Sequence, residues 1–375
     1  MWQIFTLIKN MTGRNPHPTL SRKRERGSLS GPEWSKAKER SLGAAKRNPG
    51  ESRFPRVPLR CTQATIAILT LSLLLSTSCL ANTRLIVESE EGLTPILKAI
   101  HHAHSTIDLA MYGFTDPRLI EALIESQNKG KTVRILLQHS PYKQERENLS
   151  AIKRLTAAHL PLHFAPPRFL YLHQKTLIID HHQALVMTFN FTHSAFKNDR
   201  NFALVLTDPK EVSEIQQVFN ADWQNQPTDP SNPDLLWSPV NSRARMLKLI
   251  DSAKTEIKVY AQGLSDYQFI GALARAAKRG LKVEILTSAP AQGGKWKYLQ
   301  KSGVLIDRVK SRVIHAKVLI IDRKKALVGS INFTKPSLDN NRELSVLTHT
   351  QGIVNHLLNN FERDKESFHS ITPYS

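Results

Sequence analysis

The amino-acid sequence predicts an α/β fold in which one domain occurs twice in tandem. Residues 97–136 match residues 247–286 at 14 of 40 positions, and residues 173–200 match residues 315–342 at 14 of 28 positions. Such self-similarity is the sequence signature of a repeated structural unit. The second copy is eight residues shorter between the two matching blocks. We place this difference in a loop within residues 141–167, because loops tolerate deletions.

Each copy alternates between the apolar patterns of strands and of helices. Continuous apolar runs predict strands buried on both faces, and apolar residues at helical spacing predict helices that cover them. A helix over 117–129 should end at Gly130, because glycine readily adopts the left-handed conformation that closes helices. The first copy is expected to have strands at 107–112, 133–137, 176–179, 184–187 and 203–206, a helix at 96–102, and a closing helix at 211–223, whose counterpart in the second copy is 353–361.

The domain boundaries follow from the repeat and from changes in composition. A Pro-rich connector separates the two copies, as is typical of a linker. We predict five segments: a basic disordered leader at 1–56, a signal peptide or membrane anchor at 57–81, a first domain at 82–226, a linker at 227–233 and a second domain at 234–375.

Composition and charge limit the possible classes of protein. The 375 residues include 52 Lys and Arg against 32 Asp and Glu, and half of the net charge of +20 lies in the first 60 residues. A hydrophobic content of 40% excludes a wholly disordered chain. The two cysteines, Cys61 and Cys79, are too few for a disulfide-stapled scaffold. The mildly basic remainder suits an anionic partner.

The segment Cys61–Ala81 contains 21 residues without a charge. A basic flank, an apolar stretch and a small-residue end are typical of a secretory signal peptide, so we expect a secreted or periplasmic protein. The preceding 60 residues are long for such a signal, which a translation start at Val57 or Leu59 would explain. The main alternative is a retained membrane anchor at 61–81. A core helix behind a disordered tail and an organellar transit segment are the remaining interpretations.

The second matching block carries the residues suited to chemistry. Side chains two apart on a strand share a face, so each His-x-Lys pair projects an imidazole and an ammonium together, which suits an anionic substrate. Each pair is followed by an Asp and, after the next expected strand, by an Asn. The residues are His173, Lys175, Asp180 and Asn190 in the first copy, and His315, Lys317, Asp322 and Asn332 in the second.

These motifs resemble those of the phospholipase D superfamily, His-x-Lys-x4-Asp followed by Gly-Ser-x-Asn. The second copy matches fully with Gly329 and Ser330, whereas the first has Met187 and Thr188 there, which leaves a hydroxyl but puts the detailed loop shape in doubt. The resemblance implies two αβαβα-sandwich domains related by pseudo-twofold symmetry, with both motifs in one site of a monomer. It also implies a phosphodiesterase that forms a covalent phosphohistidine and uses neither a metal nor a cofactor.

The resemblance also implies roles for single residues. One His attacks phosphorus and the other protonates the leaving alkoxide, while the Lys and Asn side chains stabilise charge on the phosphoryl oxygens. In this superfamily a Glu on the strand after the motif commonly orients the His. Glu343 follows His315 by 28 residues, and Asn201 is at the matching position after His173. We therefore expect Glu343 to support His315 and Asn201 to support His173.

This expectation leaves the choice of nucleophile open. In relatives with two motifs the first His is usually the nucleophile, which favours His173, but a carboxylate beside His315 would favour His315 instead. Asp180 and Asp322 are expected to make structural contacts.

The sequence leaves two substrate classes open. Our preferred interpretation is head-group release from a phospholipid, because the 57–81 segment would bring the chain to a membrane surface. The alternative is a secreted or periplasmic endonuclease that cuts DNA or RNA, since a mildly basic protein suits either anion. A duplicated but inactive binding module is the third interpretation, and the two complete His/Lys pairs argue against it.

Overall fold

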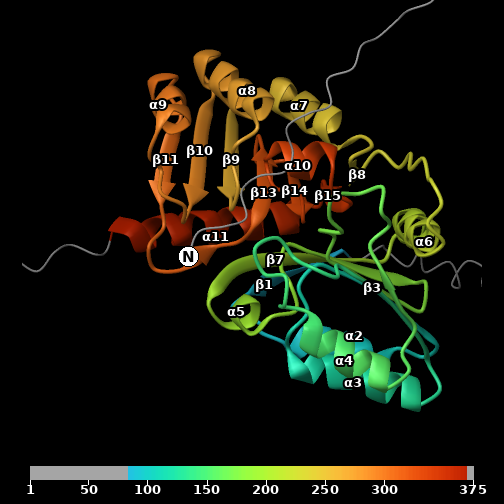
Figure 1. Ribbon diagram of the computed structural model, residues 1–375. Coiled ribbons are helices and arrows are strands. Elements are labelled where there is room, and N and C mark those ends of the chain that lie inside the picture. The colour runs from blue at the N-terminus through green and yellow to red at the C-terminus, as the bar shows by residue number, and fades with distance from the viewer. Residues whose placement is uncertain (1–82, 370–375) are drawn as a thin grey trace, which may run out of the picture. The chain divides into compact units, whose positions relative to one another are not determined.

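The computed structural model describes residues 83–369 of the chain, and Figure 1 shows the course of this region. We refer to residues 83–225 as the first half and to residues 234–369 as the second half. The leader expected at 1–56 and the signal or anchor segment expected at 57–81 lie outside the described residues. Among the helices that are described, none is both long enough and apolar enough to cross a membrane.

The first half is built on a mixed β-sheet with the strand order β1-β7-β6-β5-β2-β3-β4. The parallel pairs β2–β3 and β3–β4 lie at one end, and the other neighbours in this order are antiparallel. The strands are β1 (Arg84–Glu88), β2 (Thr106–Met111), β3 (Thr132–Leu137), β4 (Leu162–Phe164), β5 (Thr176–Ile179), β6 (Gln183–Met187) and β7 (Asp199–Leu206).

The second half repeats this arrangement in the order β8-β15-β14-β13-β9-β10-β11. One short strand, β12, leaves its own half and pairs in parallel with β7 of the first sheet. The strands are β8 (Leu235–Ser238), β9 (Glu256–Ala261), β10 (Lys282–Thr287), β11 (Leu305–Arg308), β12 (Val313–Ile314), β13 (Lys317–Ile321), β14 (Lys325–Gly329) and β15 (Glu343–Thr348).

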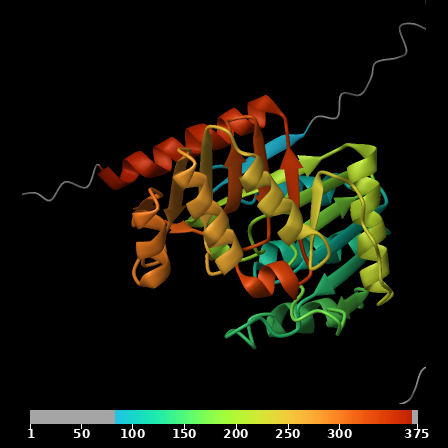
Figure 2. The same ribbon diagram turned by 90° about the horizontal axis from the view of Figure 1, so that it is seen from above.

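Helices cover both faces of both sheets. Three helices of the first half, α2 (Thr94–His102), α3 (Pro117–Asn128) and α4 (Leu149–Ala157), form one core with the outer face of the first sheet. Their counterparts in the second half are α7 (Ser242–Ser252), α8 (Tyr267–Lys278) and α9 (Gly294–Lys301). Figure 2 shows these three helices on the side of the second sheet opposite to α11 (Gln351–His369).

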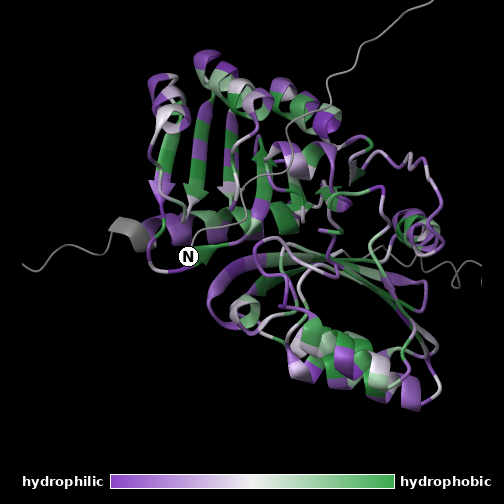
Figure 3. Cartoon of the chain, viewed as in Figure 1, coloured by the Kyte–Doolittle hydropathy of each residue, from purple (hydrophilic) through white to green (hydrophobic). Residues whose placement is uncertain are grey.

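A third core joins the two halves. It combines the inner faces of both sheets with apolar side chains of α6 (Pro209–Trp223) and α11. In the hydropathy colouring of Figure 3 the strands are predominantly apolar, as expected for strands buried on both faces. The successive layers are therefore helix, sheet, helix, sheet and helix, which confirms the predicted pair of αβαβα-type domains.

Local sequence explains why corresponding helices begin and end at the same places. The Asp116 carboxylate accepts a hydrogen bond from the Arg118 amide at the start of α3, and the Asp266 carboxylate accepts one from the Phe269 amide at the start of α8. Both Asp side chains thereby satisfy amides that lack a partner within the helix. Gly130 and Gly280 follow the two helices with φ of +85° and +90°, a conformation that favours glycine.

Two buried ion pairs cross from one half to the other. Arg200 on β7 binds Asp364 on α11 with Nε and Nη2 at 2.7 and 2.9 Å from the carboxylate oxygens. Arg342, immediately before β15, binds Asp222 on α6 at 2.8 Å. Both guanidinium groups are 2% exposed. Since a buried charge without a partner is costly, these pairs favour one relative placement of the halves.

The halves differ in length where the sequence indicates. Residues 138–148 connect β3 to α4, whereas only residues 288–293 connect β10 to α9. The region 141–167 is not a loop throughout, because it also contains α4 and β4. Nine residues of α4 carry too short an apolar pattern to distinguish a helix from a loop.

Candidate active site

The two His-x-Lys segments each form backbone hydrogen bonds with the opposite half of the molecule. The His173 amide donates to the Arg342 carbonyl at 3.0 Å, and the Ala316 amide donates to the Arg200 carbonyl at 2.9 Å. His173 and His315 therefore lie beside the first residues of β15 and β7, respectively. This exchange brings the residue after each Arg next to the imidazole of the other half.

The supporting residues are consequently paired in the reverse of the expected way. His173 Nδ1 lies 2.7 Å from Glu343 Oε2, and His315 Nδ1 lies 2.9 Å from Asn201 Oδ1. Our expectation that Glu343 supports His315 and Asn201 supports His173 is therefore wrong. It assumed that each His is oriented within its own half, whereas each motif contacts the other half.

The contact with Glu343 determines which nitrogen of His173 is free. A carboxylate only accepts hydrogen bonds, so Nδ1 of His173 carries the proton and donates it to Glu343. In the neutral imidazole, Nε2 then keeps its lone pair. Glu343 is fully buried, and its other oxygen accepts a hydrogen bond from Asn341 at 3.0 Å. The carboxylate is therefore held firmly behind the imidazole.

Burial and crowding of positive charge affect the titration of both histidines. Burial lowers the pKa of His173 to about 4, although the Glu343 carboxylate acts in the opposite direction. Burial, followed by the neighbouring Lys317, holds the pKa of His315 well below its ordinary value. Lys317 Nζ lies 3.2 Å from His315 Nδ1. In the free protein both imidazoles are therefore neutral near pH 7.

The two motif lysines are buried beside these histidines. Lys175 Nζ donates to the His173 carbonyl at 2.7 Å, and Lys317 Nζ donates to the Thr188 carbonyl at 3.0 Å. Burial lowers the pKa of Lys175 to about 7 and that of Lys317 well below its usual range. Two ammonium groups held at one place without a matching number of carboxylates favour the binding of an anion.

The two motif asparagines lie close to the backbone of two glycines. Asn190 Oδ1 accepts a hydrogen bond from the Gly113 amide at 3.3 Å. A Cβ at Gly113 would lie 3.1 Å from the Asn190 side chain, and one at Gly263 would lie 3.2 Å from Asn332 Oδ1. The two glycines thus leave room for the asparagines. Asn332 Oδ1 is buried without a hydrogen-bond partner among the described residues.

The hydroxyl groups before these asparagines differ between the halves. Thr188 Oγ1 donates to Asn201 Oδ1 at 2.8 Å and accepts from the Phe202 amide at 3.0 Å. Thr188 therefore helps to fix the amide that contacts His315. Ser330 Oγ accepts from the Leu344 amide at 3.2 Å and makes no recorded contact with Glu343 among the residues described.

The motif aspartates bind backbone amides at the start of a strand. Asp180 accepts hydrogen bonds from the amides of His104, Ser105 and Thr106 at 2.7 to 2.9 Å. Asp322 binds residues 254–256 in the same manner. Both aspartates have a positive φ, near +50°, which these contacts stabilise. Their contacts place them in the framework of each half.

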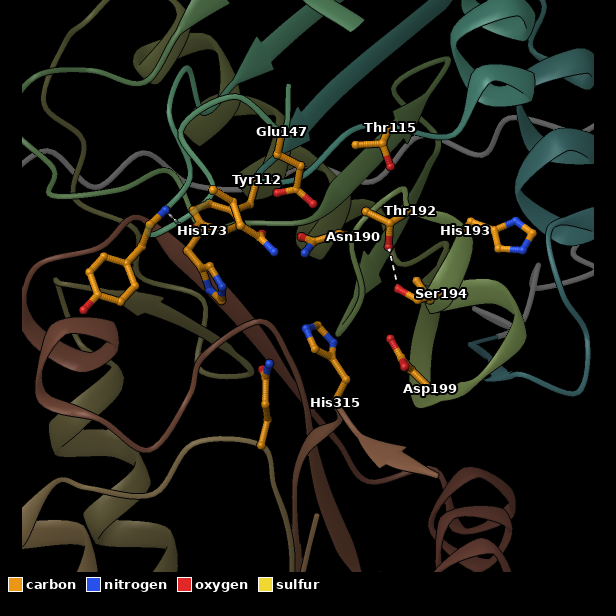
Figure 4. A pocket seen from close by; sticks show the side chains of 14 residues that line it. Tyr112, Thr115, Glu147, His173, Asn190, Thr192, His193, Ser194, Asp199 and His315 are labelled. Atoms are coloured by element: carbon orange, nitrogen blue, oxygen red, sulfur yellow. Dashed lines mark hydrogen bonds between the residues drawn. The ribbon is translucent and has the colours of Figure 1, made fainter. Parts of the chain in front are cut away.

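A cavity of about 570 Å³ brings the two imidazoles to one site. Figure 4 shows His173 and His315 projecting into it from different halves, with Asn190 nearby. Lys175, Lys317 and Asn332 do not line the cavity themselves. The lining residues are Tyr112, Thr115, Tyr142, Gln144, Glu147, His173, Asn190, Thr192, His193, Ser194, Ala195, Asp199, Gln262 and His315.

Sequence reasoning missed several of these residues. The edge of the Tyr112 ring packs on His173 with ring centroids 4.6 Å apart, and Lys175 Nζ lies 5.0 Å above the Tyr112 ring. Glu147 belongs to the longer connection of the first half, and burial raises its pKa. Asp199 also has a pKa raised by burial. The length difference between the copies was the available signal for Glu147, whereas nothing in the sequence distinguished Tyr112 from other strand residues.

Metal ligands are a separate question. Within residues 83–369, no group of three or more His, Cys, Asp or Glu side chains is arranged to hold a metal ion.

Known proteins provide an independent comparison. A phospholipase D of Rickettsia conorii is 36% identical over 123 residues, which cover 32% of this chain and 61% of that protein. Cardiolipin synthase B of Escherichia coli K12 is 24% identical over 316 residues, covering 71% of this chain and 76% of that protein. The matched region thus spans about three fifths of the rickettsial protein.

Solved structures show the same fold at low sequence identity. The phosphatidylserine synthase of Haemophilus influenzae superposes with a TM-score of 0.60 at 12% identity and covers 76% of this chain and 86% of that one. The polyphosphate kinase of Porphyromonas gingivalis gives a TM-score of 0.60 at 16% identity and covers 76% and 50%.

A family comparison covers both halves. The sequence model described as "Cardiolipin synthase, PLD-like domain" matches residues 96–223 and again residues 246–365, well over half of the chain. The two matched stretches contain both His-x-Lys motifs and both supporting residues. The chain is therefore a member of the phospholipase D superfamily.

Proposed function

We propose that this chain is a phosphodiesterase of the phospholipase D type that releases the head group of a phospholipid. The observation that carries the proposal is the unequal support of two imidazoles in one cavity. His173 is held by the Glu343 carboxylate and His315 by the neutral Asn201 amide. This difference suits a nucleophile and a proton donor acting on one phosphate.

In the first step His173 Nε2 attacks phosphorus, and the bond from phosphorus to the head-group oxygen breaks. Glu343 stabilises the positive charge that develops on the imidazole. His315 gives its Nε2 proton to the departing alkoxide, so a neutral alcohol leaves. The product is a phosphatidyl group bonded to His173. Both the position of Glu343 and the usual order of roles in the superfamily favour His173 as the nucleophile.

In the second step a water molecule attacks the phosphohistidine. His315, now neutral, removes a proton from the water as it attacks. The phosphorus–nitrogen bond breaks, His173 recovers its lone pair on Nε2, and phosphatidate is released. His315 thereby regains the proton that it gave to the leaving group, so the cycle closes without a metal or a cofactor.

Substrate binding prepares the protonation states that these steps need. The phosphate brings a negative charge to a site where burial and mutual repulsion lower the pKa of Lys175, Lys317 and His315. An added anion favours the charged form of each group and raises all three pKa values. His315 can then carry the proton that it donates. The lysines and the amides of Asn190 and Asn332 stabilise the phosphoryl oxygens.

The proposal is tested with the full chain and phosphatidylcholine vesicles in the presence of EDTA. Free choline and phosphatidate should appear in equal amounts, and His173→Ala should release neither. Cleavage of single- or double-stranded DNA or of RNA, without lipid turnover, would instead assign the site to nucleic acid. Loss of lipid turnover on addition of EDTA would contradict the metal-independent mechanism.

A further inference from the structure

A second cavity adjoins the candidate active site on the side of His315. It measures about 650 Å³ and is lined by four cations, Lys197, Arg308, Lys310 and Arg312, and by no acidic side chain. Arg312 lies 3.9 Å from Asp364. Within residues 83–369, the other three cations form no ion pair at 4.0 Å or less. We call this the basic cavity.

The basic cavity and the catalytic cavity share structural elements. The short helix α5 (His193–Lys197) contributes Ser194 to the catalytic cavity and Lys197 to the basic cavity. Val313 lines the basic cavity and His315, two residues later, lines the catalytic cavity. A substrate can therefore extend from His315 past α5 into the basic cavity.

The corresponding place on the other side of the site carries no such charge. The first-half positions that match Lys310 and Arg312 are Arg168 and Leu170. Arg168 Nη2 is bound to Asp222 at 2.6 Å, so its charge is already paired. The second-half position that matches Lys197 is an acidic residue, Asp339. The cluster of cations is therefore confined to the His315 side.

We propose that the basic cavity binds a second phosphate of the substrate, carried by the alcohol that leaves. The substrate class that fits is a phospholipid whose head-group alcohol is itself phosphorylated. This inference rests on the proposed function, because the proton donor His315 lies where the leaving alcohol departs. Arg and Lys side chains that converge on one phosphate form charge-assisted hydrogen bonds with it. Three cations without ion pairs supply that charge.

The test compares two anionic lipids in micelles of a non-ionic detergent. Diphosphatidylglycerol has a leaving alcohol with its own phosphate, whereas phosphatidylglycerol has a leaving alcohol without one. Lys310→Gln combined with Arg308→Gln should raise KM for diphosphatidylglycerol on the order of tenfold or more and leave phosphatidylglycerol unchanged within about twofold. Lys278→Gln, an exposed change on α8, controls for the loss of one charge and should alter neither KM.

The same micelles also separate the inference from the proposed function. Binding is measured with His173→Ala, which should not turn over either lipid. If this protein binds diphosphatidylglycerol more tightly than phosphatidylglycerol and Lys310→Gln abolishes the preference, the cavity assignment holds even where wild-type turnover is absent. Equal weakening of both lipids overturns the assignment, because it reports only surface charge. Loss of oligonucleotide binding with both lipids unaffected also overturns it, in favour of a nucleic-acid strand.

Discussion

The motif regions of the two halves are nearly identical in sequence but differ in the residue that contacts each imidazole. His173 faces a buried carboxylate from β15, and His315 faces an amide from β7. Each partner comes from the opposite half, immediately after an arginine whose carbonyl accepts a backbone hydrogen bond from the motif. The comparison teaches that repeated motifs can take different roles when each is supplied with a different partner by the other repeat.

The largest expected effect comes from removing either imidazole. His173→Ala and His315→Ala should each lower phospholipid turnover by roughly 10⁴-fold or more, because attack and protonation are both needed. The roles separate with a phosphodiester whose leaving group needs no proton, such as a nitrophenyl ester. His315→Ala should then still accumulate a covalent adduct, measured by mass spectrometry, and His173→Ala should not. The opposite pattern would make His315 the nucleophile.

Exchanging the supporting residues should have the next largest effect. Glu343→Gln is expected to lower kcat by about 10³-fold to 10⁴-fold, since it removes the charge that stabilises the His173 imidazolium. Asn201→Ala should cost less, about tenfold, because Asn201 carries no charge. Steady-state rates of the two variants measure this difference. Equal losses in both would mean that the partners only hold the rings in place.

The pH profiles of the same variants sharpen the comparison. Wild-type kcat/KM should fall as pH drops toward about 4, where His173 becomes protonated. Glu343 raises the pKa of His173 against the effect of burial, so Glu343→Gln should move this limb to lower pH. Asn201→Asp would add a carboxylate beside His315 and raise its pKa, so the alkaline limb should move to higher pH. An unmoved alkaline limb would remove His315 as the acid.

The smallest expected effect distinguishes the two buried ion pairs between the halves. Arg200→Met leaves Asp364 buried without its main partner and should lower the free energy of unfolding by about 3–5 kcal/mol. Arg342→Met should cost less, because Arg168 still binds Asp222 at 2.6 Å. Urea denaturation followed by tryptophan fluorescence measures both. Arg200→Met with Asp364→Leu should recover much of the loss, and no recovery would indicate that Arg200 acts by packing alone.

Much of the architecture was predictable from the sequence because it depends on local pattern. Helix α3 was confirmed to within a residue, with Gly130 beyond its end, since apolar periodicity and capping residues act over a few positions. The edge strands β1 and β8 and the short helices α5 and α10 (Lys335–Asp339) were not expected. They are brief, and they are stabilised by neighbours that are distant in the chain.

The sequence by itself determined which residue types the site contains, because a duplicated His-x-Lys-x4-Asp motif is readable without a fold. Tertiary structure decided the partners. Glu343 was expected to support the His of its own half, but β12 pairs with β7 and the segment before β5 pairs with Arg342, so each imidazole reaches the other half. The physical reason is that such contacts join residues 114 and 170 positions apart, and only the shared core between the two sheets brings them together.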